Sequence, residues 1–291
     1  MINTLITSLT IAFQSFVALL LAYKLKSPTE LSLAVYIISA AFFFSVVTHA
    51  ISQSVFTPIY IKLKRGNTNF LTFTLILLFC MSGVMLILVF LLRDGVASIL
   101  QIDFETFGLS VEHVFVIILI STLLSNVCSV LKMYLIKAGK LRQYFLMDLA
   151  GLVVVITVYI SYPVSINVAV LQPISISLFS ILMVAGFFLN PGLSKIKYTY
   201  FKRFLKYVYA KTVWAFANSV VSKIDIVLDR TLVGSIVLTN IATLHYSLQF
   251  ISAFTGLLAK LFYPTVIKVN SEKEKRLDST IELVRVAVPL C

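Results

Sequence analysis

Residues 114–136, VFVIILISTLLSNVCSVLKMYLI, form a run of 23 residues with one charged side chain, Lys132. A helix of about 20 apolar residues crosses the roughly 30 Å of hydrocarbon in a bilayer, so this run is long enough to span a membrane. Comparable runs lie near residues 2–23, 31–61, 70–92, 144–162, 164–189, 204–233 and 238–264, and a ninth begins near Ser279. Because the runs lack a consistent two-residue alternation, they favour helices over a β-barrel.

The composition supports the same interpretation. Of 291 residues, 59% are hydrophobic and 12% are charged, and the mean hydropathy is +1.00, whereas soluble domains carry about 25% charged residues. The first run lacks a basic n-region and a small-residue cleavage site, so we expect it to remain as a span. The sequence therefore predicts an all-α, polytopic transmembrane helix bundle.

Motifs of soluble catalysis are missing from the sequence. It contains no GxxxxGK[ST] loop, no HExxH and no glycine-rich turn between a strand and a helix, which are the common phosphate and zinc signatures. Cys80, Cys128 and Cys291 lie in or beside apolar runs, without metal-ligand spacing. We predict that the protein is not an enzyme and has no cofactor or metal site.

The net charge of +12 follows the predicted topology. Alternate loops hold 17 of the 24 basic residues: Lys62, Lys64, Arg65, Lys132, Lys137, Lys140, Arg142, Lys195, Lys197, Lys202, Arg203, Lys206, Lys211, Lys268, Lys273, Lys275 and Arg276. The intervening loops hold only Lys24, Lys26, Arg93 and Arg230, with several acidic residues. This positive-inside bias predicts a cytoplasmic N-terminus, and some attraction to membrane lipids, without a nucleic-acid partner.

A boundary is predicted after the sixth span. Residues 190–203, NPGLSKIKYTYFKR, combine a turn signal with a basic run. Residues 55–63, VFTPIYIKL, and 261–269, LFYPTVIKV, match at four of nine positions, 206 residues apart. A repeat of six spans is common in transporters. We therefore expect an N-terminal lobe at 1–190 with six spans, a basic cytoplasmic linker at 191–203, and the start of a C-terminal lobe at 204–291, with about two and a half spans.

One span carries a concentration of ionisable groups. Within NSVVSKIDIVLDRTLVGS, residues 218–235, a polar stripe at helical spacing consists of Asn218, Ser222, Asp225 and Asp229, with Lys223 and Arg230 beside it. A charge at the bilayer centre costs at least about 2.5 kcal/mol, so the stripe should face a watery cavity or partner charges. Two interpretations remain open: a transport path, or ion pairing that holds the bundle together.

Weaker polar stripes occur on other spans. They comprise Thr7, Thr10 and Gln14; Ser45, His49 and Ser52 with Gln53 beside them; Ser121, Ser125, Cys128 and Lys132 with Asn126 adjacent; and His245, Gln249, Ser252 and Gly256. Each is compatible with ordinary hydrogen bonding between helices, or with a shared polar cavity. His49 is either a proton-coupling residue or a buried, hydrogen-bonded histidine. We also expect Asp148, near Arg142, to be hydrated or ion-paired, and Pro173 to kink the sixth span.

A family resemblance lies in SKIDIVLDRTLVGSIVLTNIATLHYSLQFISAFTGLLAKLFYPTVIKV. The string resembles the seventh and eighth helices of Wzx-type polysaccharide flippases, in the multidrug/oligosaccharidyl-lipid/polysaccharide exporter superfamily. The matching features are Ile224-Asp225, Val233-Gly234, His245-Tyr246 and Phe262-Tyr263-Pro264. Where members have Gly-Tyr at the start of the eighth helix, this chain has Thr239-Asn240. The recognisable region is about a sixth of the chain, and its pattern separates subfamilies poorly.

The resemblance implies a two-lobed transporter of twelve to fourteen helices in the bacterial inner membrane. It would move undecaprenyl-diphosphate-linked oligosaccharide, an O-antigen or capsule repeat unit, by alternating access. Polysaccharide polymerase and ligase machinery would be partners. Substrate would be held in the cavity by Lys223, Arg230, Asn218, Ser222, Gln249 and Gln14. A coupling proton or ion would be held by Asp225, Asp229 or His49.

Two alternatives stay open from the sequence. One is another exporter of the same superfamily, for lipid II or for drugs and cations, although a positively lined cavity disfavours cationic drugs. The other is a truncated, non-transporting membrane protein, because the ninth apolar run contains only about a dozen residues after Ser279. On this basis we expect that residues 1–291 alone do not transport, since half of the second lobe would be missing around the polar stripe.

Overall fold

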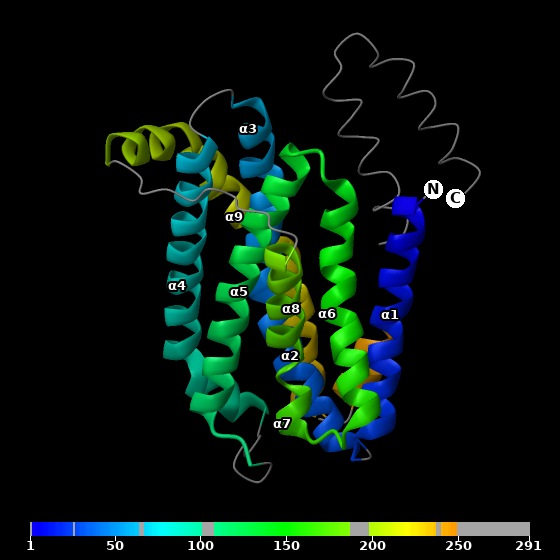
Figure 1. Ribbon diagram of the computed structural model, residues 1–291. Helices are drawn as coiled ribbons and strands as arrows, with labels where there is room; N and C mark the ends of the chain where they lie inside the picture. Colours follow the sequence, from blue (N-terminus) through cyan, green and yellow to red (C-terminus); the bar gives the residue numbers. More distant parts are fainter. Residues whose placement is uncertain are drawn as a thin grey trace, which may run out of the picture.

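The computed structural model is helical throughout the part of the chain that it describes, residues 2–25, 27–63, 67–100, 108–186, 198–236 and 240–248. Figure 1 shows these helices side by side. They are α1 (Ile2–Lys24), α2 (Pro28–Ile51), the π-helix η1 (Ser52–Phe56), α3 (Thr57–Lys62), α4 (Asn67–Leu100), α5 (Val111–Lys137), α6 (Leu141–Ser161), α7 (Ile166–Ala169), α8 (Gln172–Gly186) and α9 (Tyr198–Ile236). Residues 240–248 are also helical.

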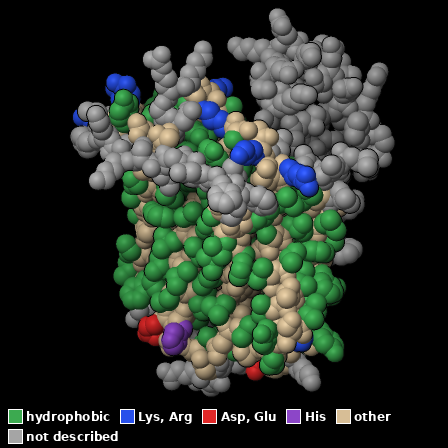
Figure 2. All heavy atoms as spheres, viewed as in Figure 1, with side chains coloured by type: hydrophobic (Ala, Val, Ile, Leu, Met, Phe, Trp, Pro, Cys, Tyr) green, Lys and Arg blue, Asp and Glu red, His purple; other side chains and the backbone are tan. Residues whose placement is uncertain are grey.

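The protein is membrane-embedded. Five helical segments of the described part are long and apolar enough to cross a bilayer: Pro28–Lys62, Thr68–Ile87, Val111–Lys137, Arg142–Ser161 and Ile166–Ala185. Figure 2 shows that the middle of the visible face is apolar, with most of its Lys and Arg at one end and its acidic and histidine side chains at the other. This arrangement is compatible with the predicted helical membrane bundle, because an apolar zone between two polar ends matches the hydrocarbon layer between two interfaces.

Helix α2 lies inside the bundle. It begins at Ser27, whose hydroxyl accepts from the Glu30 backbone N–H at 3.5 Å, and Pro28 occupies the first helical turn, as expected for a helix start. It continues through η1 into α3. In the most apolar stretch of 18 residues within this segment, 67% of the residues are buried. Helices α4, α5 and α9 all pack against α2. The segment is therefore apolar around most of its circumference.

Helices α6 and α8 approach each other closely at Gly151. A Cβ atom at this position would lie 2.8 Å from the Ile176 Cα atom, closer than real Cβ atoms come to a neighbouring backbone. Glycine therefore permits the helix contact, as small residues do between membrane helices. By contrast, a Cβ at Gly83 in α4 would meet nothing within 4 Å.

The sixth predicted span is interrupted. It consists of the short α7, a turn at residues 170–171, and α8. Pro173 lies in the first turn of α8, where its missing N–H is one that a helix start leaves unpaired anyway. The expected kink is therefore a break that precedes the proline.

Helix α9 is longer than one membrane span and changes direction along its length. Figure 1 shows its first turns lying across the end of the bundle before the helix runs down along the other helices. Phe201 and Phe204 anchor these turns against Phe73 of α4, with ring centroids 5.2 and 5.5 Å away. Farther along, helical residues 240–248 contact α1 and α2: the Tyr246 hydroxyl donates to the Ala18 carbonyl at 3.2 Å, and the Ala242 N–H to the Ser32 hydroxyl at 3.3 Å.

Candidate functional site

An ion pair lies between α5 and α6, inside two candidate membrane spans. Lys132 Nζ is 2.7 Å from Asp148 Oδ1, and the two side chains are 13% and 33% exposed. Lys132 also lies over the ring of Tyr144, 5.7 Å from its centroid. The pair satisfies charges that would each be costly alone among apolar side chains. It therefore fixes the lateral position of α5 against α6.

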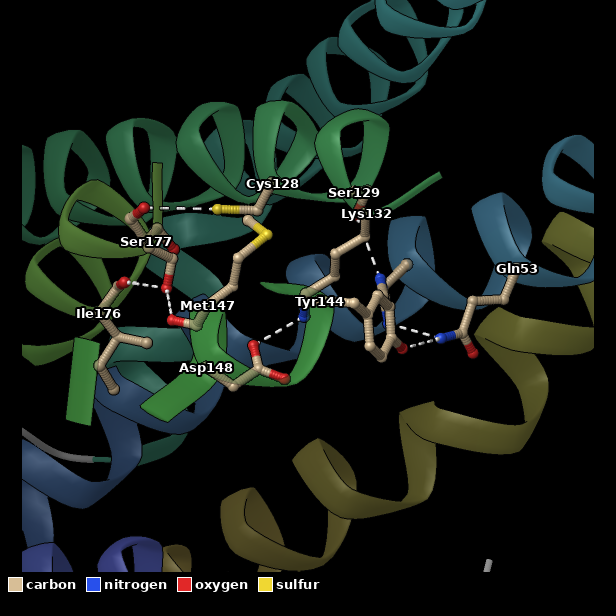
Figure 3. Close-up of polar contacts among 11 residues, drawn as sticks. Gln53, Cys128, Ser129, Lys132, Tyr144, Met147, Asp148, Ile176 and Ser177 are labelled. Atoms are coloured by element: carbon tan, nitrogen blue, oxygen red, sulfur yellow. Dashed lines mark hydrogen bonds and ion pairs between the residues drawn. The ribbon is translucent and has the colours of Figure 1, made fainter. Parts of the chain in front are cut away.

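Polar contacts continue from this pair to α2, starting at Tyr144, whose ring lies under Lys132. Gln53 Nε2 donates to the Tyr144 hydroxyl at 3.4 Å and lies 2.9 Å from His49 Nε2. His49 Nδ1 is 3.2 Å from Ser129 Oγ on α5. Figure 3 shows Gln53 and Tyr144 pointing toward each other, with Lys132 and Asp148 on the other side of the Tyr144 ring. We call these six residues, His49, Gln53, Ser129, Lys132, Tyr144 and Asp148, the polar network.

The protonation state of His49 controls one bond of the polar network. Because the Gln53 amide nitrogen is a donor, the neutral imidazole accepts at Nε2 and carries its proton on Nδ1, which then donates to Ser129 Oγ. A second proton on the ring would place an N–H at Nε2 against the Gln53 amide N–H. The Gln53 side chain would then have to turn its oxygen toward His49, and the Tyr144 hydroxyl, which can donate as well as accept, would donate to that oxygen instead. The network can therefore convert a proton into a side-chain rearrangement.

The backbone is irregular at this place. Gln53 belongs to η1, and the Thr57 hydroxyl donates to the Ser52 carbonyl at 2.9 Å across it. A π-helix adds one residue to a turn, so it redirects the side chains that follow, and such turns are frequent at functional sites. Pro58 lies in the first turn of α3, directly after η1. The irregular turn sets Gln53 between His49 and Tyr144.

A second polar layer joins α4 to α5. Asn126 is fully buried, and its Nδ2 donates to Ser82 Oγ at 2.8 Å and to the Leu78 carbonyl at 3.4 Å. Its Oδ1 and the Ser121 hydroxyl are buried without a hydrogen-bond partner within the described residues. Cys128 on the same helix donates to the Ser177 carbonyl of α8 at 3.3 Å. The stripe predicted on this span therefore contacts α6 and α8, while Asn126 contacts α4.

The sequence-predicted site residues fall into three groups. His49 belongs to the polar network, as the hydrogen-bonded alternative predicted. Asn218 and Asp229 are exposed on α9, and Gln14 is exposed on α1. The side chains of Ser222, Lys223, Asp225 and Arg230 lie outside the described residues, as does Gln249.

The two described members of the predicted α9 stripe lie away from the packed face of that helix. Val208, Thr212 and Ser219 are buried on α9, whose neighbours include α2 and α4. Asn218 and Asp229 are exposed. The polar groups at these two positions therefore do not serve to join α9 to its packed neighbours.

Four of the six residues of the polar network were named from the sequence, but their contacts with one another were not predicted. Lys132 and Asp148 were each singled out, but not as partners, and neither was assigned a site role. Tyr144 was not identified, because a tyrosine near a helix end is usually an interfacial residue. The described residues contain no group of three or more His, Cys, Asp or Glu that could hold a metal ion.

Comparison with known proteins returns no match: no family model, curated protein or solved structure is similar to the chain. The fold and its polar network define a helical membrane protein with ionisable groups inside the bundle. Ionisable groups at such positions commonly mark substrate or ion pathways in transporters.

Proposed function

We propose that the chain is, or is part of, a flippase that carries undecaprenyl-diphosphate-linked oligosaccharide across the bacterial inner membrane. The observation that carries this proposal is the exposure of Asn218 and Asp229 on α9, on a different side of the helix from the buried Val208, Thr212 and Ser219. If α9 crosses the membrane, as the proposal requires, a carboxylate on this side is costly unless it borders a watery cavity. The N-terminus is cytoplasmic in this proposal, and residues 204–291 begin a second lobe after six spans.

The substrate chemistry follows from the residues of the α9 stripe and their resemblance to the exporter family. A diphosphate head group is anionic, and Lys223 and Arg230 would attract it through charge-assisted hydrogen bonds. Asn218, Ser222, Gln249 and Gln14 would contact the hydroxyl groups of the glycan. The polyprenyl tail would stay in the bilayer, so the cavity would have to open sideways to lipid.

Coupling to a proton would involve His49 together with Asp225 and Asp229. The two aspartates are four residues apart on one helix face, so their charges repel and favour uptake of one proton. His49 contributes in a different way: a second proton on its ring would turn the Gln53 amide and reverse the direction of its hydrogen bond with Tyr144. Because η1 contacts both α5 and α9, a change at Gln53 would reach the helix that carries the substrate stripe.

The test uses the gene in the bacterium that encodes it. Deleting the gene is expected to remove a surface polysaccharide and to leave its undecaprenyl-diphosphate-linked repeat unit in the inner leaflet, measured by lipid extraction and mass spectrometry. Supplying the complete gene that contains this sequence on a plasmid should restore export, whereas residues 1–291 alone should not. An unchanged surface glycan and an unchanged pool of lipid-linked oligosaccharide after deletion would contradict the proposal.

Site variants then separate substrate binding from structure. Lys223→Ala is expected to abolish export with protein levels near normal, whereas Lys223→Arg should retain part of it. Arg142→Ala is the matched control, because Arg142 is exposed at the start of α6, away from the stripe. Loss of the protein from the membrane in both Lys223 variants would instead support the structural ion-pair interpretation.

A further inference from the structure

The first half of α9 has two unlike faces. Phe201, Phe204 and Val208 face the bundle, and Val208 is completely buried. The opposite face carries three exposed basic residues, Lys202, Arg203 and Lys206, and a fourth, Lys211, is exposed at the side of the helix. A helix with a packed apolar face and a basic outer face is suited to an interface between protein, lipid and water.

Aromatic side chains lie beside these basic groups at a regular spacing. Tyr200, Tyr207 and Trp214 are seven residues apart, so they follow one side of the helix. They are 39%, 62% and 77% exposed. Lys211 Nζ lies 5.7 Å from the centre of the Tyr207 ring. Exposed Tyr and Trp are typical of the headgroup level of a membrane, where the ring is apolar and its polar tip remains wet.

The packing of α9 sets the level at which this face lies. Phe204 stacks edge-to-face on Phe70, with ring centroids 5.2 Å apart. Phe70 is one turn from Asn67, where α4 begins. The start of α9 therefore lies at the end of the bundle, which Figure 1 shows directly, and Figure 2 shows that Lys and Arg gather at this end.

We propose that this face of α9 binds anionic phospholipid headgroups. Lys202, Arg203 and Lys206 would pair with lipid phosphates, and Tyr207 and Trp214 would lie among the headgroups. Charge complementarity selects this occupant: three exposed cations within five residues repel a second copy of the same face but attract an anionic leaflet. The proposal is independent of what the protein transports.

The depth of Trp214 provides the first test, because it is the single tryptophan of the chain. The purified protein is reconstituted in vesicles of phosphatidylglycerol and phosphatidylcholine, with bromine atoms placed either high or low on the acyl chains. We expect strong quenching by the shallow bromine and weaker quenching by the deep one. Absence of quenching by both probes, or stronger quenching by the deep probe, would overturn the proposal.

Lipid selectivity provides the second test. In lipid nanodiscs at low salt, the preference for phosphatidylglycerol over phosphatidylcholine is measured by native mass spectrometry. Each basic residue near an anionic surface is worth about a five-fold preference, so the triple variant Lys202→Gln, Arg203→Gln, Lys206→Gln should lose on the order of 100-fold. The charge-preserving variant Lys202→Arg, Arg203→Lys, Lys206→Arg should keep the wild-type preference.

The salt dependence of the wild-type protein gives a third test, which does not require any variant to fold. The Debye length falls from about 30 Å at 0.01 M to about 3 Å at 1 M salt, so the wild-type preference should fall steeply over this range. A wild-type preference that ignores salt would overturn the proposal, and so would a folded triple-glutamine variant with unchanged selectivity.

Discussion

Replacing Asp148 with asparagine is expected to destabilise the protein by about 3 kcal/mol. The carboxylate lies 2.7 Å from Lys132 Nζ, and the Lys132 side chain is only 13% exposed. Removing one partner of a buried ion pair costs about 3–5 kcal/mol, because the remaining charge is left without compensation. Asp148 is 33% exposed, so water can partly replace it. The expected cost therefore lies at the lower end of that range.

The double variant Lys132→Met, Asp148→Asn separates the charge effect from the loss of packing. With both charges removed, no unpaired cation remains, and methionine replaces the aliphatic stem of lysine at similar volume. We expect the double variant to lie within about 1.5 kcal/mol of the wild type, well above Asp148→Asn alone. The coupling between the two positions should then be at least about 1.5 kcal/mol, the difference between the loss in Asp148→Asn and the loss in the double variant, plus whatever Lys132→Met costs alone.

The measurement is an unfolding titration with dodecyl sulfate in mixed micelles, followed by circular dichroism. Arg142→Gln is the control on the same helix, since an exposed charge contributes within about 0.5 kcal/mol. The reasoning is refuted if Asp148→Asn unfolds like the control, or if the effects of the two single substitutions simply add in the double variant.

Three further predictions concern packing, the polar network and topology. Gly151→Ala should destabilise the protein by about 1–3 kcal/mol through its clash with the Ile176 backbone. Gly83→Ala, which meets open space, should be neutral or stabilising by up to about 1 kcal/mol in the same titration; equal effects of the two would contradict the helix contact. Tyr144→Phe removes the acceptor of the Gln53 amide and should lower the free energy of unfolding by about 1 kcal/mol. Added to Gln53→Leu, it should cause no further loss of stability, and additive costs of the two substitutions would exclude the bond. Reporter fusions should read cytoplasmic at Asn67, Gly139, Lys197 and Asn270, and periplasmic at Gln101. Two reversed reporters would be enough to reject the orientation.

The positions of the helices could be predicted from the sequence because membrane spans obey a length rule. The apolar runs at 31–61, 114–136 and 144–162 correspond to described helices within a few residues at each end. Local irregularities of the helices were harder to predict from the sequence. The π-helix η1 has no sequence signature apart from the Pro58 that follows it. The α7–α8 break depends on how residues 164–171 pack on α2 and α6, which an apolar sequence does not encode locally.

The site was less predictable than the fold, since a polar stripe gives the face of a helix but not the neighbour that it meets. His49 was identified as a polar residue on α2, yet its partner Ser129 is 80 residues away. The Gln53–Tyr144 bond joins residues 91 apart. The first bond depends on α2 lying against α5, and the second on η1 lying near α6, packing choices made by apolar side chains over the whole bundle. The α9 stripe remains a sequence prediction at Lys223, Asp225 and Arg230.

Contacts between adjacent helices could have been predicted from residue numbers alone. Two antiparallel helices joined by a short connection bring together residues that are equally far from its centre, at about 1.5 Å of depth per residue. Lys132 and Asp148 are each eight residues from Lys140, beside the Gly139 turn, so each lies about 12 Å into the bundle. Ser82 and Asn126 are likewise each 22 residues from position 104, between α4 and α5.

Depth matching has a physical basis in the cost of unpaired polar groups. A charged or amide side chain inside an apolar helix must find a partner at its own depth, and the adjacent helix of the hairpin is the neighbour that the chain connection guarantees. Two polar groups at equal depth on adjacent spans therefore predict a contact before any packing is known. The rule predicts nothing for α2, whose polar groups face helices that are not its neighbours in sequence. That difference explains why the Lys132–Asp148 pair could have been predicted, whereas its connection to His49 through Tyr144 and Gln53 required the structure.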